Sequence, residues 1–194
     1  MLMSPRLRRY AYFGLLGLVL AVMVHLASML ALPSFASQNA DARLAAFADR
    51  HVVTLLPAAV PGPSPLPFRD PATVMAVCRY DLAAGPIRVQ ATAGEVFLSM
   101  AFHRSMGGVF YALTDRSAVR GLMDVVIVTQ PQLEALQAND PEDEPVRELR
   151  LVSPDRTGFV TFRALAPEPG VAADAEALLK AAVCRPEPLP AKGK

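Results

Sequence analysis

Histidines are the first residues to consider for acid–base chemistry, because an imidazole changes its charge near neutral pH. Outside the apolar N-terminal region the chain has two, His51 and His103. Together with Ser99 or Ser105 and Asp115, His103 supplies the residue types of a Ser-His-Asp triad. No nucleophile-elbow pattern accompanies them, and any domain of this size contains serine, histidine and aspartate residues by chance. We therefore predict a histidine at a strand end and no catalytic residue.

Acidic residues gather at one place, where Asp140, Glu142, Asp143 and Glu144 follow one another closely. Calcium loops alternate their ligands and place a glycine at the centre, and this segment does neither. No histidine or cysteine cluster has the spacing of a zinc site. The sequence predicts a solvated acidic turn, and it indicates neither a metal nor a cofactor.

The two cysteines, Cys78 and Cys184, are too far apart for a CxxC redox motif. A single pair in an exported domain favours a disulfide, which would join an early strand to the C-terminal helix. The alternative is two buried free thiols. We predict the disulfide, whose loop of about 105 residues would contribute about 4–5 kcal/mol in the chain-entropy model.

An apolar segment precedes all of these residues. Residues 10–32 are 23 residues without a formal charge. A helix rising about 1.5 Å per residue would span roughly 34 Å with them, enough for a bilayer's hydrocarbon core. Arg6, Arg8 and Arg9 come before this run, and such positive charge stays on the cytoplasmic side. The sequence therefore predicts residues 1–9 in the cytoplasm, one span in the lipid bilayer, and the remainder outside.

A cleaved signal peptide is the alternative for this segment. Ser34-Phe35-Ala36 offers small residues for a leader peptidase, with cleavage after Ala36. Signal-peptide cores are usually about 7–15 residues long, and this run is longer. We favour the anchor in a bacterial inner membrane. Both alternatives place the C-terminal domain in the periplasm.

Two connecting segments follow the membrane span. Residues 33–56 predict a helical stalk, in which Leu44, Phe47 and Ala48 have helical spacing. Residues 57–72 are rich in proline, which removes amide donors and favours extended geometry. We interpret this stretch as a spacer or strap rather than as a recognition ligand for an aromatic groove.

The rest of the chain changes to short apolar or alternating runs separated by turn residues, which predict strands. The predicted strands are residues 74–80, 87–91, 95–104, 109–113, 123–129, 149–152 and 158–165. Gly107-Gly108 predicts a hairpin, and Ser153-Pro154-Asp155 predicts a second one. Residues 130–139 and 172–183 predict helices.

Residues 73–185 are therefore expected to form one exported β-rich domain, and residues 186–194 a disordered tail. The predicted fold class is α+β, mostly β. It comprises an N-terminal transmembrane helix and stalk, then a small antiparallel β-sandwich or barrel-like domain with two peripheral helices. Such a domain is large enough to bury a core of its own.

The charge balance excludes one class of partner. The first 36 residues carry three arginines and no acidic side chain, which leaves 16 basic and 18 acidic side chains beyond them. A nearly neutral domain has no electrostatic footprint for a polyanion. We therefore expect no nucleic acid among the partners.

One stretch resembles a known family. Residues 79–87 read RYDLAAGPI, residues 97–100 read FLSM, and Val109-Phe110 follows. This order is similar to the family catalogued as domain of unknown function 1254, and the chain resembles its short, membrane-anchored branch. Members have an Asp, a small residue, Gly-Pro and an apolar strand, then an aromatic-Ser strand that often ends in an acidic residue. His103 replaces that acidic residue here.

The resemblance implies a β-rich exported domain and no established reaction. It also implies a companion protein of the unknown-function family 1214. The candidate binding residues that it indicates are Arg79, Tyr80 and Asp81, to which we add His103. Asp81 also suits a purely structural role, because an Asp before Gly-Pro often hydrogen-bonds its own turn.

These observations favour a non-catalytic envelope module that binds a partner or assists an assembly. Exported enzymes of this size usually show a nucleophile, paired carboxylates or a metal cluster. The alternative is a small-molecule-binding or enzymatic domain with a pocket near Asp81 and His103.

Overall fold

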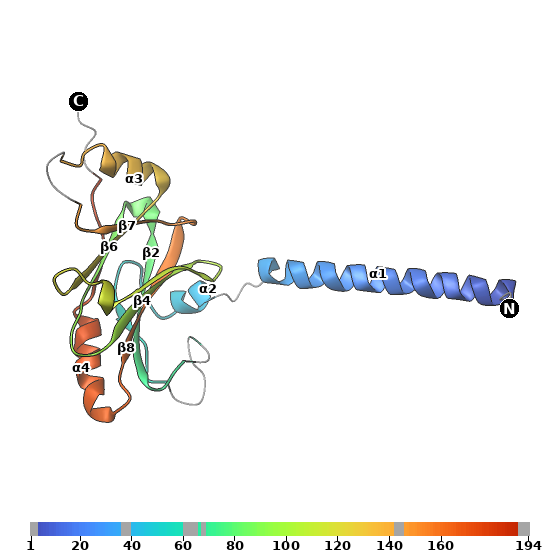
Figure 1. The fold of residues 1–194 in the computed structure, drawn as a ribbon, viewed down its shortest axis with the longest axis horizontal. Coiled ribbons are helices and arrows are strands. Elements are labelled where there is room, and N and C mark those ends of the chain that lie inside the picture. The colour runs from blue at the N-terminus through green and yellow to red at the C-terminus, as the bar shows by residue number, and fades with distance from the viewer. Residues whose placement is uncertain (1–3, 36–39, 60–65, 67–68, 142–145, 190–194) are drawn as a thin grey trace. The chain divides into compact units, whose positions relative to one another are not determined.

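The computed structural model describes residues 4–35, 40–59, 66, 69–141 and 146–189. The chain divides into two compact units, Met1–Ser37 and Gln38–Lys194. Figure 1 shows a long helix as the first unit and a β-rich fold as the second. We describe each unit by itself.

The first unit is helix α1 (Pro5–Phe35), which is long and apolar enough to cross a membrane between Pro5 and Leu32. Its apolar side chains are exposed, unlike those of a helix in a protein core. The helix begins before the predicted span, since a proline is well tolerated in the first helical turn. Arg6, Arg8 and Arg9 therefore belong to the helix itself.

Two sheets make up most of the second unit. One has five strands in the order β1 (Thr54–Leu55), β2 (Thr73–Asp81), β8 (Thr157–Leu165), β4 (Leu98–Arg104) and β5 (Val109–Thr114). The other has four, in the order β7 (Leu149–Val152), β6 (Leu122–Val128), β3 (Ile87–Thr92) and β9 (Val183–Pro186). The α+β, mostly β prediction is thus confirmed.

Both sheets contribute to one apolar core. Alternate residues of each strand point inward, as the period of two in a β-strand requires. Tyr80, Phe102 and Phe162 come from the five-stranded sheet, and Ile87 and Ile127 come from the four-stranded sheet. The run of apolar residues predicted as a buried central strand is β6, which pairs with β3 on one side and β7 on the other.

A disulfide joins the two sheets through this core. Cys78 lies on β2 and Cys184 lies on β9, with the two Cα atoms 6.5 Å apart. The predicted pairing agrees with this geometry, but its position differs in one respect. Helix α4 (Pro169–Lys180) ends before Cys184, so the bond connects strand to strand rather than strand to helix.

The predicted helical stalk packs onto the sandwich instead. Helix α2 spans only Ala40–Ala45. Leu44, Ala48 and Leu56 are buried against Val77 and Phe159, on the face of the five-stranded sheet that points away from the main core. Helical spacing placed Leu44 and Ala48 on one apolar face correctly, and that face covers a sheet because β2 and β8 present apolar side chains on both sides.

Two pairings differ from the sequence-based expectation. Gly107-Gly108 does connect β4 to β5 as a hairpin. The second predicted hairpin is wrong, because β7 and β8 belong to different sheets. Strand β7 pairs in parallel with β6, so the sandwich is not purely antiparallel. Ser153 leaves β7 and directs the chain toward the other sheet by bonding Tyr80 and the Asp155 carbonyl.

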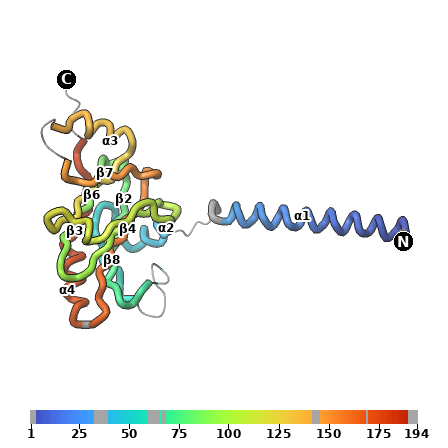
Figure 2. Tube along the Cα trace, in the orientation of Figure 1, coloured from blue at the N-terminus to red at the C-terminus, as the bar shows by residue number. Residues whose placement is uncertain are grey.

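The two peripheral helices lie at opposite ends of the sandwich, as the traces in Figures 1 and 2 show. Helix α3 (Gln130–Gln137) begins at a capping box on Thr129, and α4 packs against strands of both sheets. Pro186, predicted as tail, instead pairs with Ile87 of β3, and Glu187 donates its amide to the Pro86 carbonyl and binds Arg88. The remaining tail from residue 190 and half of the proline-rich stretch, residues 60–65 and 67–68, lie outside the described residues.

Glycine at position 158 permits the closest approach inside the five-stranded sheet. A Cβ atom there would lie 2.5 Å from the Tyr80 hydroxyl oxygen and would also collide with the His103 carbonyl oxygen. Because the carbonyl is backbone in a paired strand, it cannot easily move away. Any larger residue would push β4 or the Tyr80 ring out of place.

Removal of the disulfide by the double substitution Cys78→Ala and Cys184→Ala should lower the free energy of unfolding by about 4 kcal/mol. Urea unfolding of the full chain in detergent measures this. Reductant should destabilise the wild type similarly and leave the double variant unaffected. Equal stability of oxidised and reduced wild type would contradict the prediction.

Gly158→Ala should destabilise the domain by about 2 kcal/mol or more, since the new methyl group has no room. Gly94→Ala is the matched control, because a Cβ at Gly94 meets only a flexible Leu178 side chain at 3.7 Å. Thermal unfolding of both variants gives the comparison. A Gly158→Ala variant as stable as Gly94→Ala would be inconsistent with this packing.

Candidate functional site

The strand register decides which candidate residues share a face. Arg79, Phe159 and His103 are paired side by side across β2, β8 and β4, so their side chains emerge on the same outer face of the five-stranded sheet. Asp81 follows Arg79 by two positions and shares that face, whereas Tyr80 points into the core. The four predicted residues therefore divide between two faces.

Arg79 holds helix α2 against the sheet. Its Nε and Nη2 donate to the two carboxylate oxygens of Asp41 at 2.9 and 3.2 Å, and its Nη1 reaches the Ala48 carbonyl at 3.5 Å. The residue is 9% exposed. A fork of this kind matches a carboxylate with two parallel bonds. Its guanidinium group is thus committed to an internal contact.

Asp81 organises the turn that follows β2. Its Oδ1 accepts from the Ala83 amide at 2.9 Å, and its Oδ2 accepts from Arg50 at 3.0 Å. The Asp81 amide in turn donates to Nε2 of His51 at 3.1 Å. The structural role considered from the sequence is therefore the one the geometry displays.

Tyr80 lies in the core with its hydroxyl group 3.1 Å from Ser153 Oγ. Burial raises the pKa of this phenol to about 12, since a phenolate would be poorly solvated there. The hydroxyl group therefore remains protonated at neutral pH. Tyr80 contributes packing and a hydrogen bond between strands rather than a reactive group.

His103 is the one of these four residues that lines the cavity described below. Its ring stacks on Phe159 with centroids 4.5 Å apart, and its Nε2 lies 3.1 Å from Thr161 Oγ1. Burial lowers the pKa of His103 to about 4, and the nearby charge of Arg163 acts in the same direction. The imidazole is therefore neutral at pH 7.

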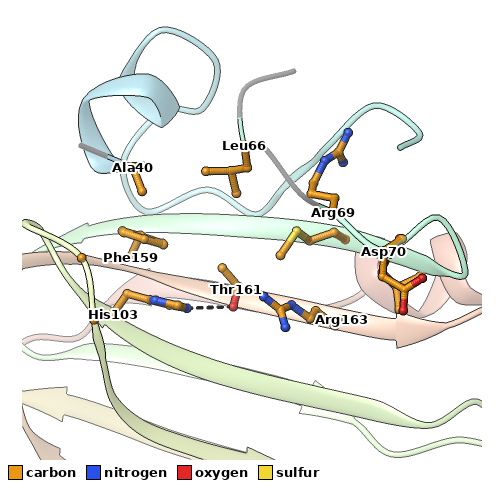
Figure 3. Close-up of a pocket in the computed structure, with 12 residues that line it drawn as sticks. Ala40, Leu66, Arg69, Asp70, His103, Phe159, Thr161 and Arg163 are labelled. Carbon is orange, nitrogen blue, oxygen red and sulfur yellow. Dashed lines mark hydrogen bonds between the residues drawn. The ribbon is translucent and has the colours of Figure 1, made fainter. Parts of the chain in front are cut away.

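The cavity has a volume of about 350 Å³ and lies on the outer face of the five-stranded sheet. Its floor includes Met75, Phe159, Thr161 and Arg163, from β2 and β8. Ala40, Leu66 and Arg69 lie across from that floor, and Asp70 lies at the end nearer Arg163 (Figure 3). In the same view His103 and Arg163 approach Thr161 from opposite sides.

Two arginines give this cavity its charge. The side chain of Arg163 has no hydrogen bond or ion pair among the described residues. Arg69 donates to the carbonyl oxygens of Pro57 and Ala58 at 2.6 and 3.2 Å, which leaves its charge without a described carboxylate. Asp70 accepts from the Ala72 amide at 2.9 Å and caps its own turn. With His103 neutral, the formal balance at the cavity is positive.

The triad considered from the sequence is not assembled. His103 bonds Thr161, whereas Asp115 accepts from the Leu98 amide at 3.4 Å. Asp140 of the acidic turn binds Arg150 twice at 2.6 Å, and this contact lowers the pKa of its carboxyl group. Within the described ranges no three His, Cys, Asp or Glu side chains could together hold a metal ion.

Sequence reasoning missed Thr161, Arg163 and Arg69. Alternation along β8 does place Phe159, Thr161 and Arg163 on one face. The missing information was which segment crosses that face, because Leu66, Arg69 and Asp70 reach it from a proline-rich stretch without a periodic pattern.

Comparisons with known proteins give similarity of fold without a named activity. The chain is similar to the crystal structure of the VPA0106 protein from Vibrio parahaemolyticus, at 15% identity and a TM-score of 0.47, covering 66% of this chain and 33% of that one. A putative uncharacterized protein from Burkholderia cenocepacia is 19% identical with a TM-score of 0.38, over 59% and 32%. The chain thus spans about a third of the length of these two structures. No family model and no curated protein matches it.

Acidification should destabilise the domain through His103. The unfolded chain takes up a proton near pH 6.5, whereas the folded chain resists protonation until about pH 4. Stability is therefore fully present above pH 6.5 and is lost as the pH falls toward 4. His103→Gln should reduce this loss by about 1 kcal/mol, a value discounted for the partial exposure of the ring.

Urea unfolding at pH 4.5 and at pH 7 measures the difference for wild type and variant. Asp and Glu residues contribute equally to both proteins, so subtraction isolates His103. An identical loss of stability on acidification in the two proteins would show that the imidazole titrates normally in the folded state.

Proposed function

We propose that the chain is a single-pass protein of a bacterial inner membrane, with its N-terminus in the cytoplasm and its sandwich in the periplasm. Helix α1 supplies a segment of sufficient length and apolarity. Arg6, Arg8 and Arg9 near its start favour a cytoplasmic N-terminus. The observation that carries the proposal is the disulfide between Cys78 and Cys184, because such bonds persist in oxidising compartments.

The sandwich acts there as a binding or assembly module rather than as an enzyme. Its most suggestive polar residues serve internal contacts: Arg79 holds Asp41, Asp81 caps a turn, and Tyr80 is buried. His103 is stacked and hydrogen-bonded to a threonine. A general base needs an accessible nucleophile or proton donor within reach, and the Thr161 residue that His103 bonds is only 2% exposed.

A membrane partner fits this architecture. Tethering two proteins to the same membrane raises their effective concentration without any new contact. The resemblance to the unknown-function family 1254 supports a companion from the unknown-function family 1214 as that partner. The partner proposal therefore rests on the anchor and on the motif at residues 79–87 together.

One observation favours a second candidate function, that of a small-molecule receptor. The cavity beside His103 has the size of a small ligand site. Asp81 does not line it, and Arg79 does not line it either. A receptor role would therefore use the cavity residues and not the set that the sequence predicts.

Reporter fusions test the topology. A reporter active only outside the cytoplasm should be active when fused after Gln38 or after Lys194, since both positions follow the proposed span. Cytoplasmic activity at either position would refute the proposal. Mass spectrometry distinguishes the anchor from a cleaved leader, because cleavage after Ala36 would leave Ser37 as the new N-terminus.

Co-purification in detergent tests the binding role. The companion protein should be recovered with wild type, and with Asp81→Ala and His103→Ala, since neither side chain is proposed to contact it. A fusion of the same membrane helix to an unrelated domain is the control. Recovery that depends on the helix alone would assign the contact to the membrane segment and reject the module.

A further inference from the structure

We propose that the cavity beside His103 binds a small organic monocarboxylate that carries a flat or short aliphatic group. The inference rests on the second candidate function, that of a small-molecule receptor, and names the class of its ligand. It depends on three features of the cavity: an arginine without a carboxylate partner, an apolar floor, and a small volume.

The first feature is the state of Arg163. Three partly buried arginines of this domain are neutralised by carboxylates: Arg79 binds Asp41, Arg88 binds Asp124 and Glu187, and Arg150 binds Asp140 and Glu148. These ion pairs have nitrogen–oxygen distances of 2.6–2.9 Å. Arg163, which is more exposed, lines the cavity without such a partner in the described part of the chain. A planar guanidinium fork is suited to a carboxylate.

Arg69 adds a second positive charge at the cavity. Two of its nitrogens donate to backbone carbonyl oxygens, and its Nε is shielded from solvent without a hydrogen-bond partner among the described residues. Asp70 is the one acidic side chain that lines the cavity in the described ranges, and it already caps a turn. The net formal charge of the lining is therefore positive by one, which suits a monoanion.

Neighbouring polar groups complete a recognition site around Arg163. Thr161 and the neutral ring of His103 are 3.1 Å apart and lie beside the guanidinium group (Figure 3). This pair has two donor hydrogens, one on the Thr161 hydroxyl group and one on the neutral imidazole. One of them is used in the bond between the two residues, and the other can be donated to a bound anion. A carboxylate between these groups would receive charge-assisted bonds in a partly water-excluded place.

The apolar part of the ligand follows from the remaining walls. Met75 and Phe159 lie on the floor, and Ala40 and Leu66 lie across from it. A volume of about 350 Å³ is near the lower limit for small-molecule sites. A benzoate-sized molecule can place its carboxylate at Arg163 and its ring against these side chains.

Calorimetry on the full chain in lipid nanodiscs tests the proposal with four probes. Benzoate should bind, and neutral benzamide of the same shape should bind at least about tenfold more weakly. Inorganic phosphate should be weak because it lacks the apolar group. Phenyl phosphate should also be weaker than benzoate, since its second charge lacks a partner. Empty nanodiscs provide the blank for partition into lipid.

Arg163→Gln should weaken benzoate binding about tenfold or more, as expected for the loss of one charge-assisted pair. Arg185→Gln is the matched control, because Arg185 is also an exposed strand arginine but lies on β9 in the other sheet. Unchanged thermal unfolding of both variants establishes that they are folded.

The ligand class is overturned if benzamide binds as well as benzoate, if Arg163→Gln binds benzoate like the wild type, or if no probe binds at millimolar concentration. Stronger binding of phenyl phosphate would replace the monocarboxylate with a phosphate monoester. Each of these outcomes is independent of topology and of the membrane partner. A domain that is exported and retains its partner but ignores benzoate would reject this inference and leave the proposed function standing.

Discussion

Burial of both faces of β2 is the constraint on which the rest of the sandwich depends. The inner face carries Cys78 and Tyr80 into the main core, and the outer face carries Val77 and Arg79 under the segment that follows helix α1. An apolar outer face must be covered, since a sheet exposed there would lose much of its hydrophobic stabilisation. The same strand also supplies Cys78 of the disulfide and the Arg79 contact with Asp41. It is therefore attached to the other sheet on its inner side and to helix α2 on its outer side.

Local sequence patterns predict the individual strands and helices more readily than they predict which strands pair with one another. Residues 125–128 are apolar without interruption, which marks a strand buried on both faces, and β6 is central in its sheet. Gly107-Gly108 fits a hairpin because both glycines adopt positive φ. Strand β7 is different. Its four residues carry no information about which sheet they join, and proximity to β8 in the sequence suggested a hairpin where the chain in fact changes sheets.

The residues predicted for the site and the residues that line the cavity differ for a related reason. Residue type and the turn motif indicated Arg79, Tyr80 and Asp81 as candidates. The side chains of these three residues form hydrogen bonds or ion pairs within the domain. A buried arginine without a carboxylate partner would be destabilising. Arg79 is paired with Asp41 and serves packing within the domain, so its presence in the sequence does not indicate a ligand site. Only His103 was both predicted and found at the cavity. The contribution of Leu66, Arg69 and Asp70 to the cavity lining depends on a long-range crossing, which no local period encodes.

The electrostatics of the cavity rest on the different protonation behaviour of histidine and arginine. If His103 were protonated at pH 7, its charge would add to that of Arg163, and the pair would repel each other across Thr161. Burial against Phe159 keeps the imidazole neutral instead, with a pKa of about 4. Arginine does not lose its proton in this pH range. The charge that the cavity presents therefore stays constant over the physiological pH range, and it is set by Arg163, Arg69 and Asp70 rather than by a titrating histidine.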